Sequence, residues 1–125
     1  RRHLIMFTEE NQKLMRDYLN SLPLEKERRG GTTYWFLPET DSEEWIAFID
    51  KITCRVVTEV RVEEHPRFGP QINTYHASSF KVFDDFKNTI DYAMVQAEDA
   101  QRKYHFMRNE WKAEHIRDCA KAYEV

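Results

Sequence analysis

Residues 79–111 read SFKVFDDFKNTIDYAMVQAEDAQRKYHFMRNEW, and neither this segment nor the chain that follows it contains Gly or Pro. Apolar residues recur through it at alternating steps of three and four, the pattern of a helix that packs along a seam. The pattern predicts one helix from Ser79 to about Tyr123, for which Ser78 and Ser79 offer a cap. The seam consists of Phe83, Phe86, Ile90, Ala93, Ala97, Ala100, Tyr104, Met107 and Trp111.

This predicted helix is long for the body that precedes it. At about 1.5 Å per residue it would reach roughly 65 Å, whereas a compact domain of this size has a radius of gyration of about 14 Å. We therefore expect one domain, residues 1–125, in which a body of residues 1–78 leads into a candidate oligomerisation element, residues 79–123. The alternative is that the helix breaks near residues 95–105 and folds back on its own sheet.

The body is predicted to be a mixed α+β fold with a small sheet of about four strands. The predicted order is strand, helix, strand, helix, strand, strand, followed by the long helix. Residues 4–7 form a short apolar run that suits a buried strand. Thr8 can cap a helix that Pro23 ends. Residues 24–31 are charged and are predicted to be a loop.

The second half of the body contains the clearest strand pattern. Residues 32–37 are β-branched and aromatic, which predicts a strand paired in parallel with residues 4–7 through a right-handed crossover. Asp41 or Ser42 is predicted to cap a short helix with an apolar face. Thr53–Glu63 alternates as a strand with one solvated face does, and the turn formers of residues 65–70 then lead to a second extended segment at 71–77. The apolar face of the short helix comprises Trp45, Ile46, Phe48, Ile49 and Ile52.

Composition excludes several classes of protein. The chain has 125 residues, 41% hydrophobic and 33% charged, with a net charge of −3, which argues against a surface that is basic throughout. No apolar run approaches the roughly 18 residues of a membrane span, so no membrane partner is expected. Cys54 and Cys119 are too few for a disulfide framework, and a reducing, cytoplasmic setting is predicted.

The seam of the long helix is the first candidate site. Its central alanines would allow a second helix to approach closely, and its aromatic residues would supply contact area. We expect a homodimer of coiled-coil type, or the docking of a protein partner whose identity the sequence does not reveal. The predicted interface comprises Phe86, Ile90, Ala93, Ala97, Ala100, Tyr104, Met107 and Trp111.

Basic residues form the second candidate site. Three of them precede Gly30 and Gly31, whose backbone amides could approach an anion, although Glu25 and Glu27 make a solvated loop the simpler interpretation. Together with cations of the long helix they could contact phosphates of a nucleic acid, with Phe68 stacking on a base. The predicted contacts are Lys26, Arg28, Arg29, Arg102, Lys103 and Arg108.

Catalytic and metal-binding patterns are sparse. His115 and Cys119 lie four apart on one helical face, a spacing shared by Glu114 and Asp118, but two ligands do not make a zinc site. His76 is expected roughly opposite Glu59 across the hairpin, as a structural pair and not as a catalytic base. No nucleophile or dinucleotide-binding motif is recognisable. We therefore predict no catalytic residues, no metal and no cofactor.

These observations favour a non-catalytic intracellular protein that acts as a regulator, adaptor or inhibitor and self-associates through its terminal helix. Small aromatic-rich chains without motifs are common among proteins encoded by phages and other mobile elements, which is an association by type only. Nucleic-acid binding is the first alternative. A small enzyme, with a site assembled from distant segments, is the second.

Overall fold

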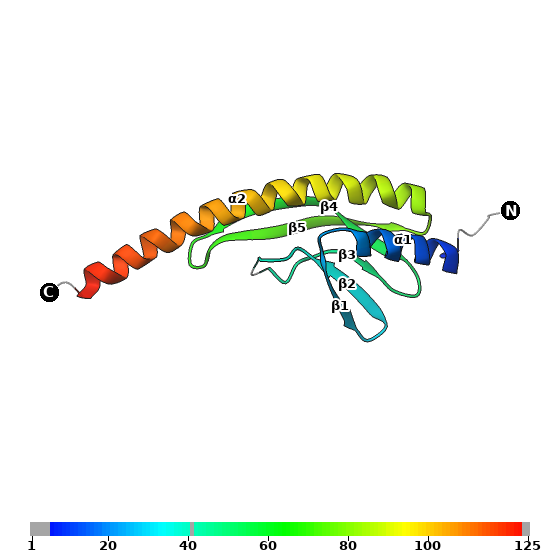
Figure 1. The fold of residues 1–125 in the computed structure, drawn as a ribbon, viewed down its shortest axis with the longest axis horizontal. Coiled ribbons are helices and arrows are strands. Elements are labelled where there is room, and N and C mark those ends of the chain that lie inside the picture. The colour runs from blue at the N-terminus through cyan, green and yellow to red at the C-terminus, as the bar shows by residue number, and fades with distance from the viewer. Residues whose placement is uncertain (1–5, 41, 124–125) are drawn as a thin grey trace.

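The structure is a computed structural model that describes residues 6–40 and 42–123, with side chains described as far as residue 117. Within these residues it contains five strands in one antiparallel sheet, whose spatial order follows the chain, β1-β2-β3-β4-β5. A short helix precedes the sheet and a long helix follows it (Figure 1). The mixed α+β class and the long C-terminal helix are confirmed. The elements are α1 (Glu9–Ser21), β1 (Glu25–Arg29), β2 (Thr32–Phe36), β3 (Trp45–Ile49), β4 (Cys54–His65), β5 (Gly69–Phe80) and α2 (Phe83–Tyr123).

Helix α1 begins where the sequence predicts. The Thr8 hydroxyl accepts a hydrogen bond from the Asn11 N–H (3.2 Å), which satisfies one of the free amides of the first turn. The helix ends just before Pro23, and its apolar side carries the buried residues Met15 and Leu19 into the core. Its position thus follows from local signals at both ends.

The predicted loop at residues 24–31 is instead β1 and a tight turn. Gly30 adopts a positive φ of 60°, which suits a two-residue connection between antiparallel strands, and Arg29 pairs with Thr32 directly across it. Every residue of β1 is exposed. A charged strand at the edge of a sheet shows no apolar alternation, and its charges discourage pairing with other chains. The sequence pattern therefore resembled that of a loop.

The short helix predicted after Asp41 or Ser42 is also wrong, because Trp45–Ile49 forms β3 between β2 and β4. A short apolar run fits a helix face and a strand equally well. The expected parallel pair does not form either, since every strand pairing in the described sheet is antiparallel. Of the predicted first strand, Met6 and Phe7 lie outside any strand, and residues 4 and 5 lie outside the described residues.

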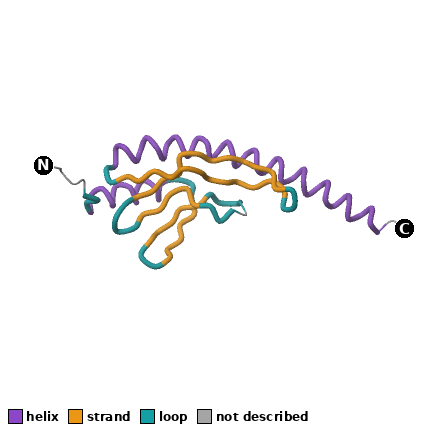
Figure 2. Tube along the Cα trace, turned by 180° about the vertical axis from the view of Figure 1, so that it is seen from behind, coloured by secondary structure: helices purple, strands orange, loops and turns teal. Residues whose placement is uncertain are grey.

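The hairpin of β4 and β5 confirms the strongest strand prediction. Its two strands have 12 residues each and pair from Cys54↔Phe80 to His65↔Gly69. β3 pairs with β4 only as far as Ala47↔Val56, so the distal half of the hairpin extends beyond the rest of the sheet (Figure 2). This extension is the platform on which α2 lies.

Helix α2 starts at Phe83, four residues later than predicted, because β5 continues through both predicted capping serines. It shows no break at residues 95–105 and runs along the hairpin and past its tip (Figure 1). Near its start it packs against α1, where the Tyr18 ring meets Phe86 edge to face at 6.1 Å. Both helices share one hydrophobic core with the sheet, which includes Met15, Leu19, Trp35, Ile46, Ile49, Val56, Phe86 and Ile90.

The connection between β2 and β3 returns alongside α2 and β5. Gln101 of α2 donates through Nε2 to the Pro38 carbonyl (2.8 Å). Ser42 donates through Oγ to the Ile72 carbonyl of β5 (3.1 Å). This connection therefore flanks the distal half of the hairpin, although β2 and β3 themselves pair elsewhere.

Candidate interaction surfaces

The apolar seam of α2 faces the protein's own sheet. Phe86, Ile90, Ala93 and Ala97 are fully buried within the single chain, and Ala100 and Tyr104 are almost so. Six of the eight predicted interface residues therefore already have a partner in β4 and β5. The helix thus packs on its own sheet, as in the alternative given above, but without the break that the alternative assumed, because the hairpin is long enough to accompany an unbroken helix.

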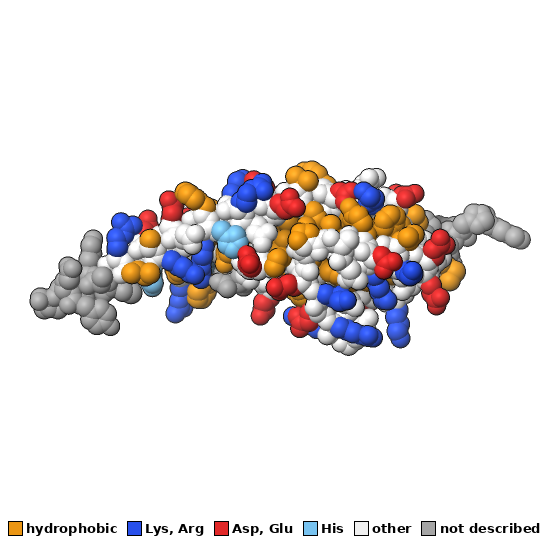
Figure 3. Space-filling model, in the orientation of Figure 1, with side chains coloured by type: hydrophobic (Ala, Val, Ile, Leu, Met, Phe, Trp, Pro, Cys, Tyr) orange, Lys and Arg blue, Asp and Glu red, His pale blue; other side chains and the backbone are white. Residues whose placement is uncertain are grey.

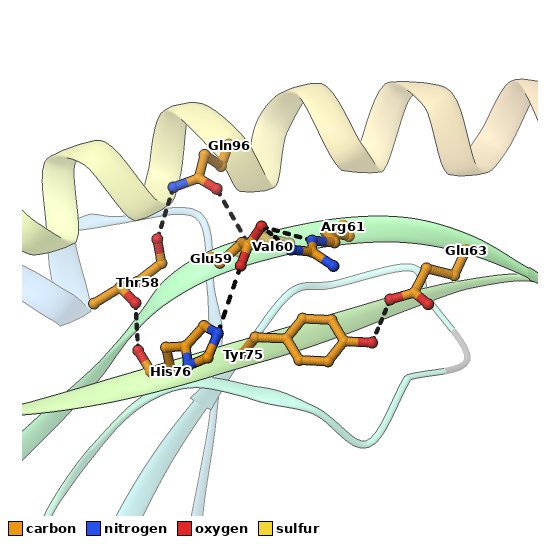
Figure 4. Close-up of polar contacts among 8 residues, drawn as sticks. All are labelled: Thr58, Glu59, Val60, Arg61, Glu63, Tyr75, His76 and Gln96. Atoms are coloured by element: carbon orange, nitrogen blue, oxygen red, sulfur yellow. Dashed lines mark hydrogen bonds and ion pairs between the residues drawn. The ribbon is translucent and has the colours of Figure 1, made fainter.

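Gln96 fixes α2 against the free edge of β4. Its Oε1 accepts a hydrogen bond from the Val60 N–H (3.2 Å), and its Nε2 donates to the Thr58 carbonyl (3.0 Å) (Figure 4). β3 has ended before these positions, so the two backbone groups lack a neighbouring strand. The side-chain amide offers the same donor and acceptor as a peptide group and takes the place of that strand.

The tip of the hairpin is docked against α2 by Arg108 and Trp111. Arg108 donates through Nη1 to the Phe68 carbonyl (2.8 Å), and its guanidinium lies 4.8 Å from the Trp111 ring centroid. The Trp111 indole also stacks on His115 at 5.1 Å. Trp111 and Met107 are half-buried. These two predicted interface residues therefore belong to the contact between helix and hairpin.

A groove of about 400 Å³ lies beside this tip, between β5, α2 and residues 42–44. It brings together four residues that the sequence singled out for different reasons, Phe68, Tyr104, Arg108 and Trp111. Glu43 and Glu44 line it on the side of the β2–β3 connection. Glu44 accepts a hydrogen bond from the Thr74 hydroxyl (2.8 Å), which ties that connection to β5.

A second apolar surface lies on the opposite side of α2. We define the outer stripe as Tyr92, Val95, Phe106 and Ile116, whose exposed fractions are 64%, 66%, 66% and 68%. At about 100° per residue these side chains fall within an arc of roughly 120° centred opposite the buried seam. These side chains do not widen the seam, because the sheet occupies the seam's side of the helix. Figure 3 shows hydrophobic groups among the charged side chains along the outer side of the helix.

A band of charges divides the outer stripe. Asp99 pairs with Lys103 at 3.0 Å and with Arg102 at 3.8 Å. These two cations were predicted to contact phosphates, but each is already paired on the helix surface. Arg108, the third helix cation of that set, lies at the hairpin tip. The helix cations therefore do not form a surface with those of residues 26–29.

The basic residues of β1 point to different sides of the sheet, as neighbours on a strand must. Lys26 and Arg28 line a hollow of about 290 Å³, together with Arg16 and Asn20 of α1 and Trp35 of β2. Arg29 instead pairs with Glu27 (3.0 Å) and lies over the rings of Tyr34 and Phe36, 5.6 Å from each centroid. The structure thus adds Arg16 to the predicted site and removes Arg29. Arg16 was missed because helix α1 carries no sequence signal that links it to residue 26.

Polar side chains on the solvated face of the β4–β5 hairpin satisfy one another (Figure 4). Glu59 lies opposite Tyr75, one residue from the predicted partner His76, whose Nε2 is 4.0 Å from Glu59 Oε2. Arg61 pairs with Glu59 (2.5 Å) and lies over the Tyr75 ring. The Tyr75 hydroxyl donates to Glu63, and this bond raises the pKa of Tyr75. The arrangement is that of a structural network.

No cluster among the described residues has the composition of a metal site, because no group of three or more His, Cys, Asp or Glu converges there. His115 is exposed and stacked on Trp111. The side chains of Asp118 and Cys119 lie outside the described set. Cys54 is buried in β4, and burial raises the pKa of its thiol to about 12.

The chain matches no protein-family model, no curated protein and no solved structure. Its function must therefore be argued from the surfaces described above. None of the described helices is long and apolar enough to cross a membrane.

Proposed function

We propose that the protein is a non-catalytic interaction protein that self-associates through α2, and that it does so with the outer stripe and not with the buried seam. The observation that carries this proposal is the alignment of four large apolar side chains, each about two-thirds exposed, on one side of a single helix. Isolated exposed apolar residues are ordinary. Apolar residues aligned along one element are characteristic of a contact surface.

The energetics favour covering this stripe. Full burial of a large apolar side chain is worth about 1.5–3 kcal/mol. In a two-fold symmetric pair each copy contributes the same four residues, so the gain is counted twice. The charged band around Asp99 would lie within or beside such a contact, where charges set register and orientation more than affinity.

The end of α2 supports the same proposal. Beyond Trp111 the helix leaves the hairpin and continues to Tyr123 (Figure 1). Isolated helices of about 12 residues are marginal in water, so this segment gains most if a second molecule packs on it. Ile116, one member of the outer stripe, lies in this projecting part.

The proposal is tested by the mass of the full chain in solution. Light scattering at micromolar concentration should give twice 15.2 kDa for the unmodified protein. Phe106→Glu and Ile116→Glu should each shift the mass towards that of the monomer. The matched control is Ile52→Glu, because Ile52 is equally exposed at 70% but lies in the β3–β4 turn. A monomeric unmodified protein, or equal effects of Ile116→Glu and Ile52→Glu, would contradict the proposal.

A role as regulator, adaptor or inhibitor is the broader form of the same proposal. In that role the outer stripe, or the groove beside Trp111, would hold a protein partner. The variants that abolish self-association would then also weaken binding of the partner if the two contacts share the stripe. Retained binding of a purified partner by Ile116→Glu would instead assign the partner to another surface.

Nucleic-acid binding is the second candidate, and one observation favours it. The hollow between α1 and β1 gathers Arg16, Lys26 and Arg28 without a carboxylate on its lining. Binding through such contacts should weaken steeply as salt increases. Fluorescence anisotropy with a labelled single strand, measured at low and at physiological salt, tests this candidate. Absence of binding at low salt would remove it.

A further inference from the structure

The hollow between α1 and the β1–β2 hairpin has the composition of an anion site. We call it the basic hollow and define it by Arg16, Lys26 and Arg28, with Asn20, Thr33 and Trp35. We propose that it binds a terminal phosphate group, that is, a phosphomonoester or inorganic phosphate. This inference is independent of α2 and of self-association.

Backbone geometry brings the cations of β1 to one side of the sheet. Lys26 and Arg28 are two residues apart on β1, so they share a face. In the register of the hairpin Lys26 lies opposite Trp35, and Arg28 lies opposite Thr33. β2 therefore forms the floor of the hollow and β1 forms one wall. Arg16 closes the opposite wall from α1.

These three positive charges are not neutralised within the fold. In the described part of the chain no carboxylate forms an ion pair with Arg16, Lys26 or Arg28. Two neighbouring acids are engaged elsewhere, because Glu27 pairs with Arg29 and Asp17 lies 3.9 Å from Lys13. An anion that enters the basic hollow therefore meets three cations and no carboxylate on the lining.

Hydrogen bonds at the hollow orient its donor groups towards a bound anion, which would act as the acceptor. Arg28 donates through Nε to the Gly30 carbonyl (3.2 Å), which anchors its guanidinium to the turn. Trp35 donates through Nε1 to Asn20 Oδ1 (3.2 Å). Because the amide oxygen of Asn20 is engaged by Trp35, its nitrogen, a donor, is the end left for an anion. The site thus offers donors and positive charge.

The charge balance favours a terminal phosphate over a phosphodiester. A phosphomonoester carries a charge of about −1.5 to −2 at pH 7 and three acceptor oxygens, whereas each phosphodiester of a nucleic-acid backbone carries about −1. Three cations on two walls match the doubly charged group better. Guanidinium groups also bind phosphate oxygens in pairs, and two of the three cations are arginines. The ligand can be a small phosphorylated molecule or the 5′ end of a strand.

The test uses the full chain and three probes: inorganic phosphate, a 5′-phosphorylated single strand and the same strand with a 5′-hydroxyl. Binding is measured by NMR titration and by anisotropy at about 50 mM salt, where phosphate contacts are not yet screened out. Phosphate should perturb the Trp35 indole N–H signal and should compete with the phosphorylated strand. The 5′-hydroxyl strand should bind at least tenfold more weakly than the phosphorylated one.

Adjacent residues provide the matched variants. Arg28→Gln should weaken phosphate binding about tenfold, because it removes one charge-assisted hydrogen-bonding group from the site. Arg29→Gln removes the same charge from the next residue, on the other side of the sheet, and should change binding less than twofold. Both residues are exposed, and thermal melting of both variants at the temperature of the unmodified chain would show that the fold is kept.

Each outcome decides the proposal. Phosphate binding that Arg28→Gln weakens and Arg29→Gln does not supports it. If phosphate binds but the phosphorylated strand competes no better than the hydroxyl strand, the site is supported and its ligand is a small phosphorylated molecule. No phosphate binding by the unmodified chain, or equal losses in the two variants, overturns the site. None of these results depends on the mass in solution, so the self-association proposal stands or falls separately.

Discussion

The indole ring of Trp111 lies so close to Gly69 that a Cβ built on this glycine would come within 2.8 Å of ring atom Cδ2. Gly69 opens β5 with a φ of +78°, a conformation that L side chains rarely adopt. Two separate constraints therefore require glycine at the point where the hairpin tip meets α2. The contact joins residues 42 positions apart in the sequence, and it is testable.

Gly69→Ala should lower the free energy of unfolding by about 2–4 kcal/mol, from backbone strain and from overlap with the ring. Gly30→Ala is the matched control, because Gly30 has a φ of +60° but nothing within 4 Å of a built Cβ. It should cost only about 1–2 kcal/mol of strain. Denaturant unfolding measures both. Equal losses in the two variants would show that Trp111 does not press on Gly69.

Gln96→Ala should destabilise the edge of β4 that has no neighbouring strand. The substitution leaves the Val60 N–H and the Thr58 carbonyl without their side-chain partner, at a cost of about 1–3 kcal/mol. Hydrogen exchange of the Val60 amide should become faster, while that of the Val56 amide, in the part of β4 that pairs with β3, should change little. Unchanged exchange at Val60 would contradict the role of Gln96 as a substitute for a strand.

Substitution of the buried seam should unfold the protein and not merely dissociate it. Ala97 is fully buried against the sheet, so Ala97→Glu places a charge in the core, and we expect a loss of at least about 3 kcal/mol. Ala113→Glu makes the same change at an exposed position of α2 and should alter the free energy of unfolding by less than about 0.5 kcal/mol. A folded, monomeric Ala97→Glu variant would instead return the seam to an interface between molecules.

Cys54 should be unreactive in the folded chain. Its thiol has an ordinary pKa of 9.0, and burial raises the pKa to about 12. At pH 8 a thiol reagent should therefore modify Cys54 only after unfolding, which peptide mapping by mass spectrometry can follow separately from Cys119. Rapid labelling of Cys54 under native conditions would contradict its burial.

The same shift predicts a pH dependence of stability. Because the pKa is higher in the folded chain, the unfolded chain loses its proton first. Stability from the neutral thiol is complete below about pH 9 and declines as the pH rises towards 12. The measurement is the difference in free energy of unfolding between the unmodified chain and Cys54→Ala, followed across this range. A difference independent of pH would show that the thiol titrates normally in the fold.

Predictions from sequence succeeded where the signal is local. Thr8 and Pro23 mark the two ends of α1, and the alternation from Thr53 to Glu63 identified β4. They failed for β1 and β3, whose identity depends on neighbours. The five charged residues of β1 are a strand because β2 lies beside them, and Trp45–Ile49 is a strand because β2 and β4 flank it. A run of five residues is too short for periodicity to separate helix from strand.

In the candidate sites, too, some residues could be recognised from the sequence and others only from the tertiary structure. Lys26 and Arg28 could be singled out by their charge, but Arg16 joins them only because α1 packs beside the β1–β2 hairpin. The outer stripe could be recognised only after the sheet had occupied the other side of α2. Tyr92, Val95 and Phe106 lie outside the seam pattern, and their common exposure is a property of the assembled fold.

The sequence by itself determined that a long uninterrupted helix ends this protein and that Phe86, Ile90 and Ala97 lie on one side of it, because periodicity and the absence of Gly and Pro act within a few turns. Only the tertiary structure decided what covers that side. The helix packs on its own β4–β5 hairpin because two 12-residue strands extend beyond the rest of the sheet and present an apolar surface of matching length. Periodicity shows that a face must be buried, and it carries no information about the surface that buries it.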